Sequence, residues 1–159
     1  MRIVELTFDR VKHVAVNMRA KDREEIFATR WSEDPEVVAE TIDTLKPIGF
    51  VALADDDEPV CVLGAYEMWP KVMSVFMFAT DRWKEVSIGT TKAVKRMLIP
   101  YALSEKVMRA ECKSLSTHDD AHRWLESLGA SKESEHPYYG KNGETFFTYS
   151  WTNPPAKTN

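Results

Sequence analysis

The sequence has 159 residues, of which 43% are hydrophobic and 29% are charged, with only 6 glycines and 8 prolines. This composition excludes a fibrous or largely disordered chain and predicts one globular domain, which we place at residues 1–152, with a flexible tail at 153–159. The formal net charge is −4 and both signs are intermixed, so we expect no nucleic-acid partner.

Three further features point to a cytoplasmic protein. No apolar run approaches the roughly 20 residues that span a bilayer, so we expect no membrane partner. The start of the chain lacks the basic and apolar regions of a secretory signal. The two cysteines, Cys61 and Cys112, lie in apolar stretches outside any CxxC pattern, which is typical of reduced core residues.

The first third of the chain predicts a short strand and three helices. Between residues 2 and 19 the apolar positions first alternate and then recur at helical spacing, which indicates a strand followed by a helix. A second helix is predicted over residues 21–31, where Asp22 and Glu25 resemble a capping pair at its start. A third begins at Pro35, because proline is favoured in the first helical turn.

The middle of the chain predicts a meander of three strands. Two apolar runs, 50–54 and 60–66, flank the acidic residues 55–58 and predict a hairpin. We expect its turn to be solvated, because the acidic residues lack the ligand spacing of a calcium loop. A third strand is predicted over residues 72–79, and a polar loop over 80–89 leads to the next helix.

The last third predicts two helices among further strands. The first helix covers residues 90–104, and Pro100 must kink or shorten it because proline lacks an amide hydrogen. The second is capped by Thr117 and ended by Gly129. Strands are predicted at residues 107–113, 130–135 and 145–151.

The approach to the long helix carries residues suited to binding an anion. Unpaired amides at a helix N-terminus face one spot, and the helix dipole favours negative charge there. Gly89 lets a ligand come close to the backbone, while Lys84 and Thr90 add a positive charge and a hydroxyl donor. The pattern is compatible with phosphate binding, although a single glycine before a helix usually marks only a turn.

The order of these elements resembles the GNAT acyltransferase superfamily over nearly the whole chain. This resemblance implies an α/β (α+β) fold, with a central, mixed, mostly antiparallel sheet flanked by helices, and acetyl-CoA as the cofactor. In GNAT proteins a loop of the form Arg/Gln-x-x-Gly-x-Gly/Ala grips the pyrophosphate of coenzyme A. The resemblance assigns this contact to five residues, with a serine where a glycine is usual: Lys84, Ser87, Ile88, Gly89 and Thr90.

A second GNAT motif, Asn-x-x-Ala-x-x-x-Tyr-x-x-x-Gly, is similar to the segment from His118 to Gly129. Ala121 and Gly129 keep the family's spacing. His118 stands in the Asn position, so the resemblance implies that it contacts the cofactor. Leu125 replaces the Tyr that commonly protonates the departing thiolate, so the usual general acid is absent.

The chain also resembles small GNAT-like proteins of tailed phages, including internal virion proteins. The segments that carry this resemblance are Thr80-Asp81-Arg82-Trp83, Lys92-Ala93-Val94-Lys95-Arg96 and Leu125-Glu126-Ser127-Leu128-Gly129-Ala130. It implies a place in the host cytoplasm or the virion, with a host or virion protein as partner.

Acyl transfer to an amine needs a polarised thioester carbonyl and a base. By resemblance to the fold, a backbone amide near Phe78 or Ala79 is the polarising donor. Glu67, at the end of an apolar strand, is the first candidate base and Asp81 the second. For each of these two acids, an ordinary surface carboxylate is the alternative.

Two functions therefore stay open. One is an acetyl-CoA-dependent N-acyltransferase, in which the amine of a small molecule or protein attacks the thioester directly. The other is a catalytically silent GNAT-fold protein that binds a host factor or forms part of a virion. An exposed Trp83 would either cover the cofactor or mark a partner surface. A homodimer is open as well. We predict no metal site, because His118 and His122, one helical turn apart, have no third ligand nearby in sequence.

Overall fold

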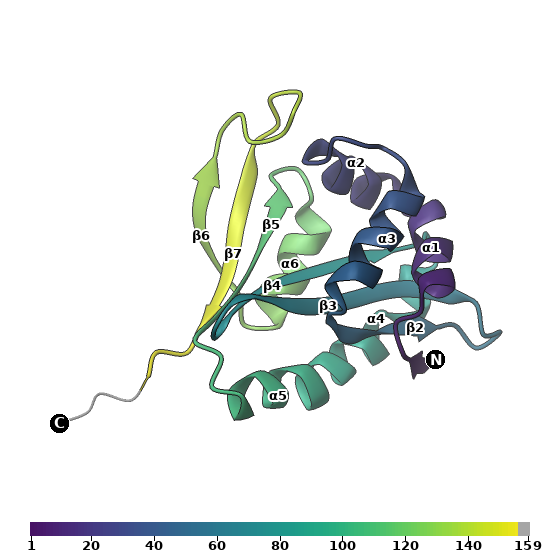
Figure 1. Cartoon of the computed structure of the whole chain (residues 1–159), viewed down its shortest axis with the longest axis horizontal. Coiled ribbons are helices and arrows are strands. Elements are labelled where there is room, and N and C mark those ends of the chain that lie inside the picture. The colour runs from purple at the N-terminus through teal and green to yellow at the C-terminus, as the bar shows by residue number, and fades with distance from the viewer. Residues whose placement is uncertain (156–159) are drawn as a thin grey trace.

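Seven strands and six α-helices make up residues 1–155, the part of the chain that the computed structural model describes (Figure 1). The strands are β1 (Arg2–Val4), β2 (Ile48–Leu53), β3 (Pro59–Trp69), β4 (Val72–Ala79), β5 (Arg109–Leu115), β6 (Ser131–His136) and β7 (Phe146–Thr152). The helices are α1 (Phe8–Val16), α2 (Ala20–Ala28), α3 (Pro35–Leu45), α4 (Trp83–Ala93), α5 (Ile99–Ser104) and α6 (Asp119–Ser127), and a π-helical turn, η1 (Val94–Leu98), joins α4 to α5.

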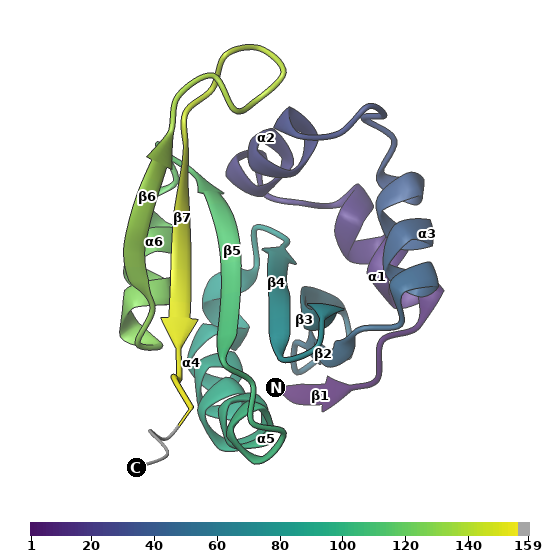
Figure 2. The same cartoon turned by 60° about the vertical axis from the view of Figure 1, so that its left-hand side comes forward.

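The strands form one sheet in the order β1-β2-β3-β4-β5-β7-β6. Neighbouring strands are antiparallel except for β4 and β5, which are parallel. This confirms the predicted mixed, mostly antiparallel sheet flanked by helices. The parallel pairing is short, because it joins residues 72–74 to residues 109–111 and stops there. Beyond this point β4 and β5 diverge (Figure 2).

The two faces of the sheet bury alternate side chains of the same strand. On β2, Val51 and Leu53 belong to a core shared with α1 and α3, whereas Phe50 and Ala52 belong to a second core shared with α4. This alternation follows from the pleat of a strand. Figure 2 shows α1 and α3 on one side of β2, β3 and β4, and α4 and α5 on the other. The break in strand pairing therefore lies at the centre of a sheet covered on both faces.

The helix α3 shows how a strong local signal positions an element. The side chain of Asp34 accepts a hydrogen bond from the Glu36 amide at 2.9 Å, and Pro35 occupies the first turn. Such a cap contributes about 1 kcal/mol to the stability of a helix. The helix ends at Leu45, shortly before Pro47, as the sequence predicts.

The long helix departs from the prediction at its start. It begins at Trp83, inside the segment predicted as a polar loop, because Trp83 and Val86 supply apolar surface to the core one turn apart. The predicted disruption at Pro100 takes the form of η1, in which the Ile99 amide donates to the Val94 carbonyl five residues back. The wider turn accommodates the proline ring, which would otherwise clash with the helix.

The C-terminal third differs from the prediction in small ways. His118, rather than Thr117, stands at the N-cap of α6, and Gly129 follows the helix with a positive φ of 90°. The Asn153 amide donates to the Met108 carbonyl at 2.8 Å, while residues 156–159 of the predicted tail lie outside the described residues. Within residues 1–155, no helix is both long and apolar enough to cross a membrane.

Candidate active site

A cavity of about 600 Å³ opens where β4 and β5 diverge. Ligand sites in proteins commonly have volumes of roughly 300–1,000 Å³ and mainly apolar walls. The apolar lining comes from both strands and from helices on both faces of the sheet, and includes Ile26, Met77, Phe78, Leu98, Trp124 and Leu125. Figure 2 shows α2 lying across the open end of the two strands.

A buried aspartate on α2 fixes the end of β4. Asp22 Oδ2 accepts a hydrogen bond from the Ala79 amide at 2.7 Å, and both carboxylate oxygens accept from the Arg19 guanidinium at 2.8–3.0 Å. The Ala79 carbonyl in turn accepts from the Arg19 amide at 2.8 Å. Burial raises the pKa of Asp22 above its ordinary value, and the Arg19 cation and the Ala79 amide oppose this rise. The end of β4 is therefore bound to α2 through a desolvated ion pair.

One turn further along α2, Glu25 reaches the end of β5. Its Oε2 accepts hydrogen bonds from the Leu115 amide at 2.6 Å and from Ser114 Oγ at 2.8 Å. The same oxygen lies 3.1 Å from Nδ1 of His118, a buried residue whose Nε2 is 3.4 Å from Asp22 Oδ1. Among the described residues Oε1 has no hydrogen-bond partner, and Glu25 lines the cavity. The carboxylate is thus held through one oxygen at the wall of the cavity.

Alternate amides of β4 face β3 and the cavity. The Thr80 amide donates to β3 at 2.8 Å, whereas the Ala79 amide points the other way, to α2. By this alternation the Phe78 amide faces β3, and the Met77 amide faces the cavity beyond the last pair with β5. Of the two amides predicted to polarise a thioester, that of Phe78 belongs to the sheet and that of Ala79 is engaged by a carboxylate. The Met77 amide lies on the β5 side of β4 beyond the last paired residue, and Met77 lines the cavity.

Neither predicted base lines the cavity. Glu67 is exposed and its Oε1 accepts a hydrogen bond from the Lys71 amide at 2.7 Å, in the turn at the paired end of β4. Asp81 is also exposed and lies beyond the other end of β4. A role for either as general base stays a prediction, and the geometry offers Glu25 instead.

The residues predicted to grip pyrophosphate lie in the first turns of α4 rather than in a loop. They are Lys84, Ser87, Ile88, Gly89 and Thr90, and none of them lines the cavity. Thr90 is fully buried, and a Cβ added to Gly89 would overlap Met1 Sδ. The glycine therefore makes room for the N-terminal residue. Binding of coenzyme A by these five residues stays a prediction.

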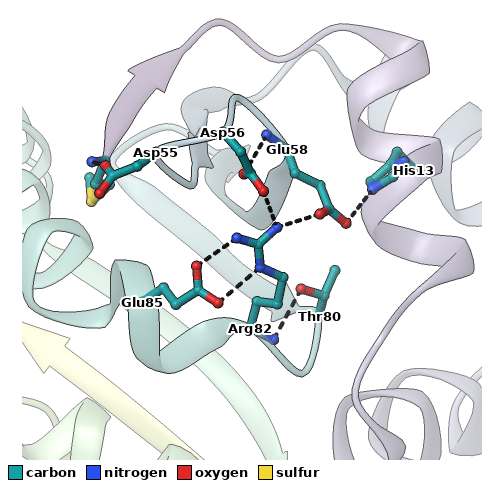
Figure 3. Close-up of polar contacts among 8 residues, drawn as sticks. His13, Asp55, Asp56, Glu58, Thr80, Arg82 and Glu85 are labelled. Carbon is teal, nitrogen blue, oxygen red and sulfur yellow. Dashed lines mark hydrogen bonds and ion pairs between the residues drawn. The ribbon is translucent and has the colours of Figure 1, made fainter.

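At the N-terminus of α4 an arginine is enclosed by carboxylates (Figure 3). The Arg82 guanidinium donates to both carboxylate oxygens of Glu85, at 2.9 and 2.7 Å, to Asp56 at 2.9 Å and to Glu58. These hydrogen bonds raise the pKa of Arg82 above its ordinary value. The acidic turn at 55–58, predicted to be solvated only, thus packs against the start of α4. We call these four side chains the Arg82 cluster.

The Arg82 cluster does not fit the nucleotide phosphates of coenzyme A. Two of the first amides of α4 are engaged within the chain, since Trp83 donates to the Thr80 carbonyl at 3.0 Å and Glu85 to the Arg82 carbonyl at 2.9 Å. One guanidinium already faces three carboxylates, so an incoming phosphate meets net negative charge. The cavity between β4 and β5, in contrast, has an unpaired strand edge in its wall and no such crowd of carboxylates.

Two indoles join α4 to α6. The rings of Trp83 and Trp124 are nearly perpendicular with centroids 5.6 Å apart, and Trp124 Nε1 donates to Thr91 Oγ1 at 2.9 Å. Trp83 is therefore half-buried in a helix contact, with the Arg19 guanidinium 5.6 Å from its ring. Leu125, which stands in the position of the GNAT tyrosine, lines the cavity and offers no proton.

Phe78 and His118 are the two predicted binding residues that line the cavity. Sequence reasoning missed Asp22 and Glu25, which it interpreted as a capping pair, whereas α2 has Arg19 at its N-cap and no side-chain cap. Their spacing was the available signal, because residues three apart lie on one helical face. Two acids on the face of an amphipathic helix that also carries Ile26 indicate carboxylates near the core.

Known structures share this fold. The ribosomal-protein-S18-alanine N-acetyltransferase from Escherichia coli is similar with a TM-score of 0.70 and 15% identity, over 99% of this chain and 97% of that chain. Aminoglycoside 6'-acetyltransferase type Ii is similar with a TM-score of 0.71 and 18% identity, over 99% of this chain and 100% of that chain. Ard1 from Thermoplasma volcanium is similar with a TM-score of 0.72 and 11% identity, over 97% of this chain and 98% of that chain. No protein-family model matches the chain, and no curated protein matches its sequence.

The sheet order, the parallel pair that diverges and these similarities define a protein with the fold of the GNAT acetyltransferases. The predicted fold is thereby confirmed. Sequence identities of 11–18% carry the likeness no further than the fold. The chemistry of this chain must therefore be argued from its own cavity.

Proposed function

We propose that this protein is an N-acyltransferase that takes an acyl group from a pantetheine thioester such as acetyl-CoA, with a site that diverges from the usual GNAT pattern. The observation that carries the proposal is the Glu25 carboxylate, held through Oε2 and free at Oε1, in a cavity of about 600 Å³. A carboxylate fixed beside a ligand cavity is the arrangement that a general base needs.

Each requirement of acyl transfer has a candidate group in the cavity. A bound thioester supplies the activated acyl carbonyl. The Met77 amide donates a hydrogen bond to the carbonyl oxygen, where negative charge develops during attack. Glu25 Oε1 accepts the proton of the attacking amine, and returns it to the sulfur of the departing thiol. This return removes the need for a tyrosine in the position of Leu125.

The amine attacks directly, without an acyl-enzyme. Cys112 lines the cavity, but burial raises the pKa of its thiol to about 12. Burial also raises the pKa of the Cys61 thiol, which lies in the core. At neutral pH both thiols are protonated and therefore poor nucleophiles. Direct attack needs only the positioned amine and the base.

The test measures binding and transfer separately. Calorimetric titration compares acetyl-CoA with S-acetylpantetheine, which lacks the nucleotide phosphates. We expect both to bind, with affinities within about tenfold, or 1.4 kcal/mol, of each other, because the Arg82 cluster offers the phosphates no cradle. If neither thioester binds at millimolar concentration, the proposal is wrong.

Transfer is followed by release of free thiol with hexylamine as the acceptor. We expect Glu25→Gln to lower kcat by about 100-fold or more, since the amide accepts no proton, and to leave thioester affinity unchanged. Glu24→Gln is the matched control, because Glu24 is exposed and its side chain pairs only with Lys21 among the described residues. Wild-type turnover in the Glu25 variant would exclude this carboxylate as the base.

A second candidate function is favoured by the contact between α4 and α6. The Trp83 and Trp124 rings and the Thr91 hydrogen bond close this part of the fold without a ligand. A GNAT-fold protein without transfer activity, serving as a virion component or binding a host factor, would keep this packed contact. Absence of thioester binding by folded protein favours this candidate over the first.

A further inference from the structure

A half-buried arginine in the cavity lacks an anionic partner. Arg30 follows α2 and lines the cavity, and its one side-chain hydrogen bond is long, 3.5 Å from Nη1 to Thr41 Oγ1. Within residues 1–155 its guanidinium takes part in no ion pair. Because a guanidinium presents several donors in a planar fork, most of those of Arg30 stay available to a ligand.

Three other partly buried arginines are neutralised by carboxylates: Arg19 by Asp22, Arg82 by Glu85 and Arg109 by Glu133. Two more, Arg10 and Arg23, lie outside the cavity and donate to the backbone carbonyls of Glu5 and Val16. Arg30 is held among apolar groups instead, and burial lowers its pKa because the charged form is desolvated. A cation kept in such a place without a partner costs free energy that an anionic ligand would offset.

A second cation lies on the β5 side of the cavity. Lys113 lines it, and its Nζ is 5.4 Å from the ring centroid of Tyr139, another lining residue. In the described part of the chain no ion pair involves Lys113. The cavity therefore carries positive charge from both sides at the positions of Arg30 and Lys113.

Glu25 supplies the complementary negative charge. Arg30 comes five positions after Glu25, two residues beyond the end of α2, and no ion pair joins the two among the described residues. Ile26 lies between them in sequence and lines the same cavity. A ligand that satisfies both groups carries a cation and an anion separated by a short apolar stretch.

We propose that the cavity binds an amine that also carries an anionic group, with its ammonium at Glu25 Oε1 and its anion at Arg30, as an ω-amino acid would bind. In naming this ligand as the acyl acceptor, the inference rests on the proposed function. Its binding, however, requires no acyl transfer. Specificity then comes from two opposite charges on α2 and the loop that follows it.

Equilibrium binding of three matched probes tests the proposal. They are 6-aminohexanoate, hexylamine and hexanoate, titrated by calorimetry or by ligand-observed NMR. We expect 6-aminohexanoate to bind at least about tenfold more tightly than either singly charged probe. A fourth probe, 4-aminobutyl phosphate, distinguishes phosphate from carboxylate as the preferred anion. Equal affinity for hexylamine and both doubly charged probes, or no binding of any probe at 10 mM, overturns the proposal.

Variants assign the preference to Arg30. Arg30→Gln should reduce the affinity for 6-aminohexanoate to that for hexylamine, and Arg30→Lys should restore part of the difference. Arg96→Gln removes the same charge from an exposed position on η1 outside the cavity and should leave all affinities unchanged. A preference that survives in folded Arg30→Gln, or falls equally in the Arg96 variant, overturns the assignment.

The two proposals fail in different experiments. Tight binding of 6-aminohexanoate with no acyl transfer contradicts the proposed function and supports the ligand class. Transfer to hexylamine with equal affinity for both amines contradicts the ligand class and supports the proposed function.

Discussion

Replacing Glu25 with alanine should destabilise the fold, because one carboxylate oxygen serves three buried groups. The Leu115 amide and Ser114 Oγ donate to Oε2 at 2.6 and 2.8 Å, and His118 Nδ1 lies 3.1 Å away. All three residues are buried. A buried polar group without a partner costs about 1–3 kcal/mol, and since water can enter from the cavity we take the low end, for a total of about 3 kcal/mol.

Urea denaturation at pH 7, followed by tryptophan fluorescence, measures this loss. With a slope of about 2 kcal/mol per molar, the midpoint should fall by roughly 1.5 M. Glu25→Gln keeps one acceptor oxygen and should lose about a third as much free energy of unfolding. Glu24→Ala, which removes only an exposed ion pair with Lys21, should cost less than about 0.5 kcal/mol. Equal losses in the two alanine variants would show that Glu25 does not hold the end of β5 against α2.

Burial raises the pKa of Asp22 above 3.8, so its stabilising contribution is full below about pH 4 and is lost as pH rises through the raised pKa. The Asp22→Asn variant should therefore gain stability relative to wild type as the pH rises from about 4 to about 7. Urea denaturation measures the difference in free energy of unfolding between the two proteins, and a difference that does not change with pH contradicts this prediction. Thr91→Val and Trp124→Phe each remove one end of the same hydrogen bond, and each should lower the free energy of unfolding by about 1–2 kcal/mol. The double variant should lose about 1 kcal/mol less than the sum of the two single losses, because the bond can be lost only once. Strictly additive losses contradict the bond. Glu85→Gln frees part of the Arg82 guanidinium. Calorimetry should then show a several-fold rise in the affinity for acetyl-CoA relative to that for S-acetylpantetheine. An unchanged ratio of the two affinities means that the phosphates bind elsewhere.

Elements with strong local signals were predictable from the sequence. The strand predicted over residues 72–79 coincides with β4, because an apolar run with one polar residue is bounded by turn residues on both sides. Pro35, in the first turn, likewise located α3. The start of α4 was predicted wrongly for a physical reason. Its first turn is rich in charge, which suggests a loop, but the charges of Arg82 and Glu85 neutralise each other on the helix surface.

The candidate site depended on contacts that local patterns do not encode. Asp22 meets a strand amide 57 positions later in the chain, and Glu25 meets another 90 positions later. Periodicity could place both acids on one face of a helix, but not beside the ends of two diverging strands. His118 was found because its position in a motif, rather than its chemistry, marked it.

The two ends of the site differ in charge, and this difference limits which ligand each can select. A helix N-terminus favours negative charge, and in α4 the chain's own Glu85 already satisfies that preference through the first turn. Arg82 cannot also bind a phosphate through the same donors without releasing that carboxylate. At the α2 end, Glu25 Oε1 and Arg30 are unpaired among the described residues, so charge there is available to a ligand. In the proposed reaction, the affinity for the thioester must therefore come from its apolar arm in the cavity. Selection by charge then acts on the acceptor amine.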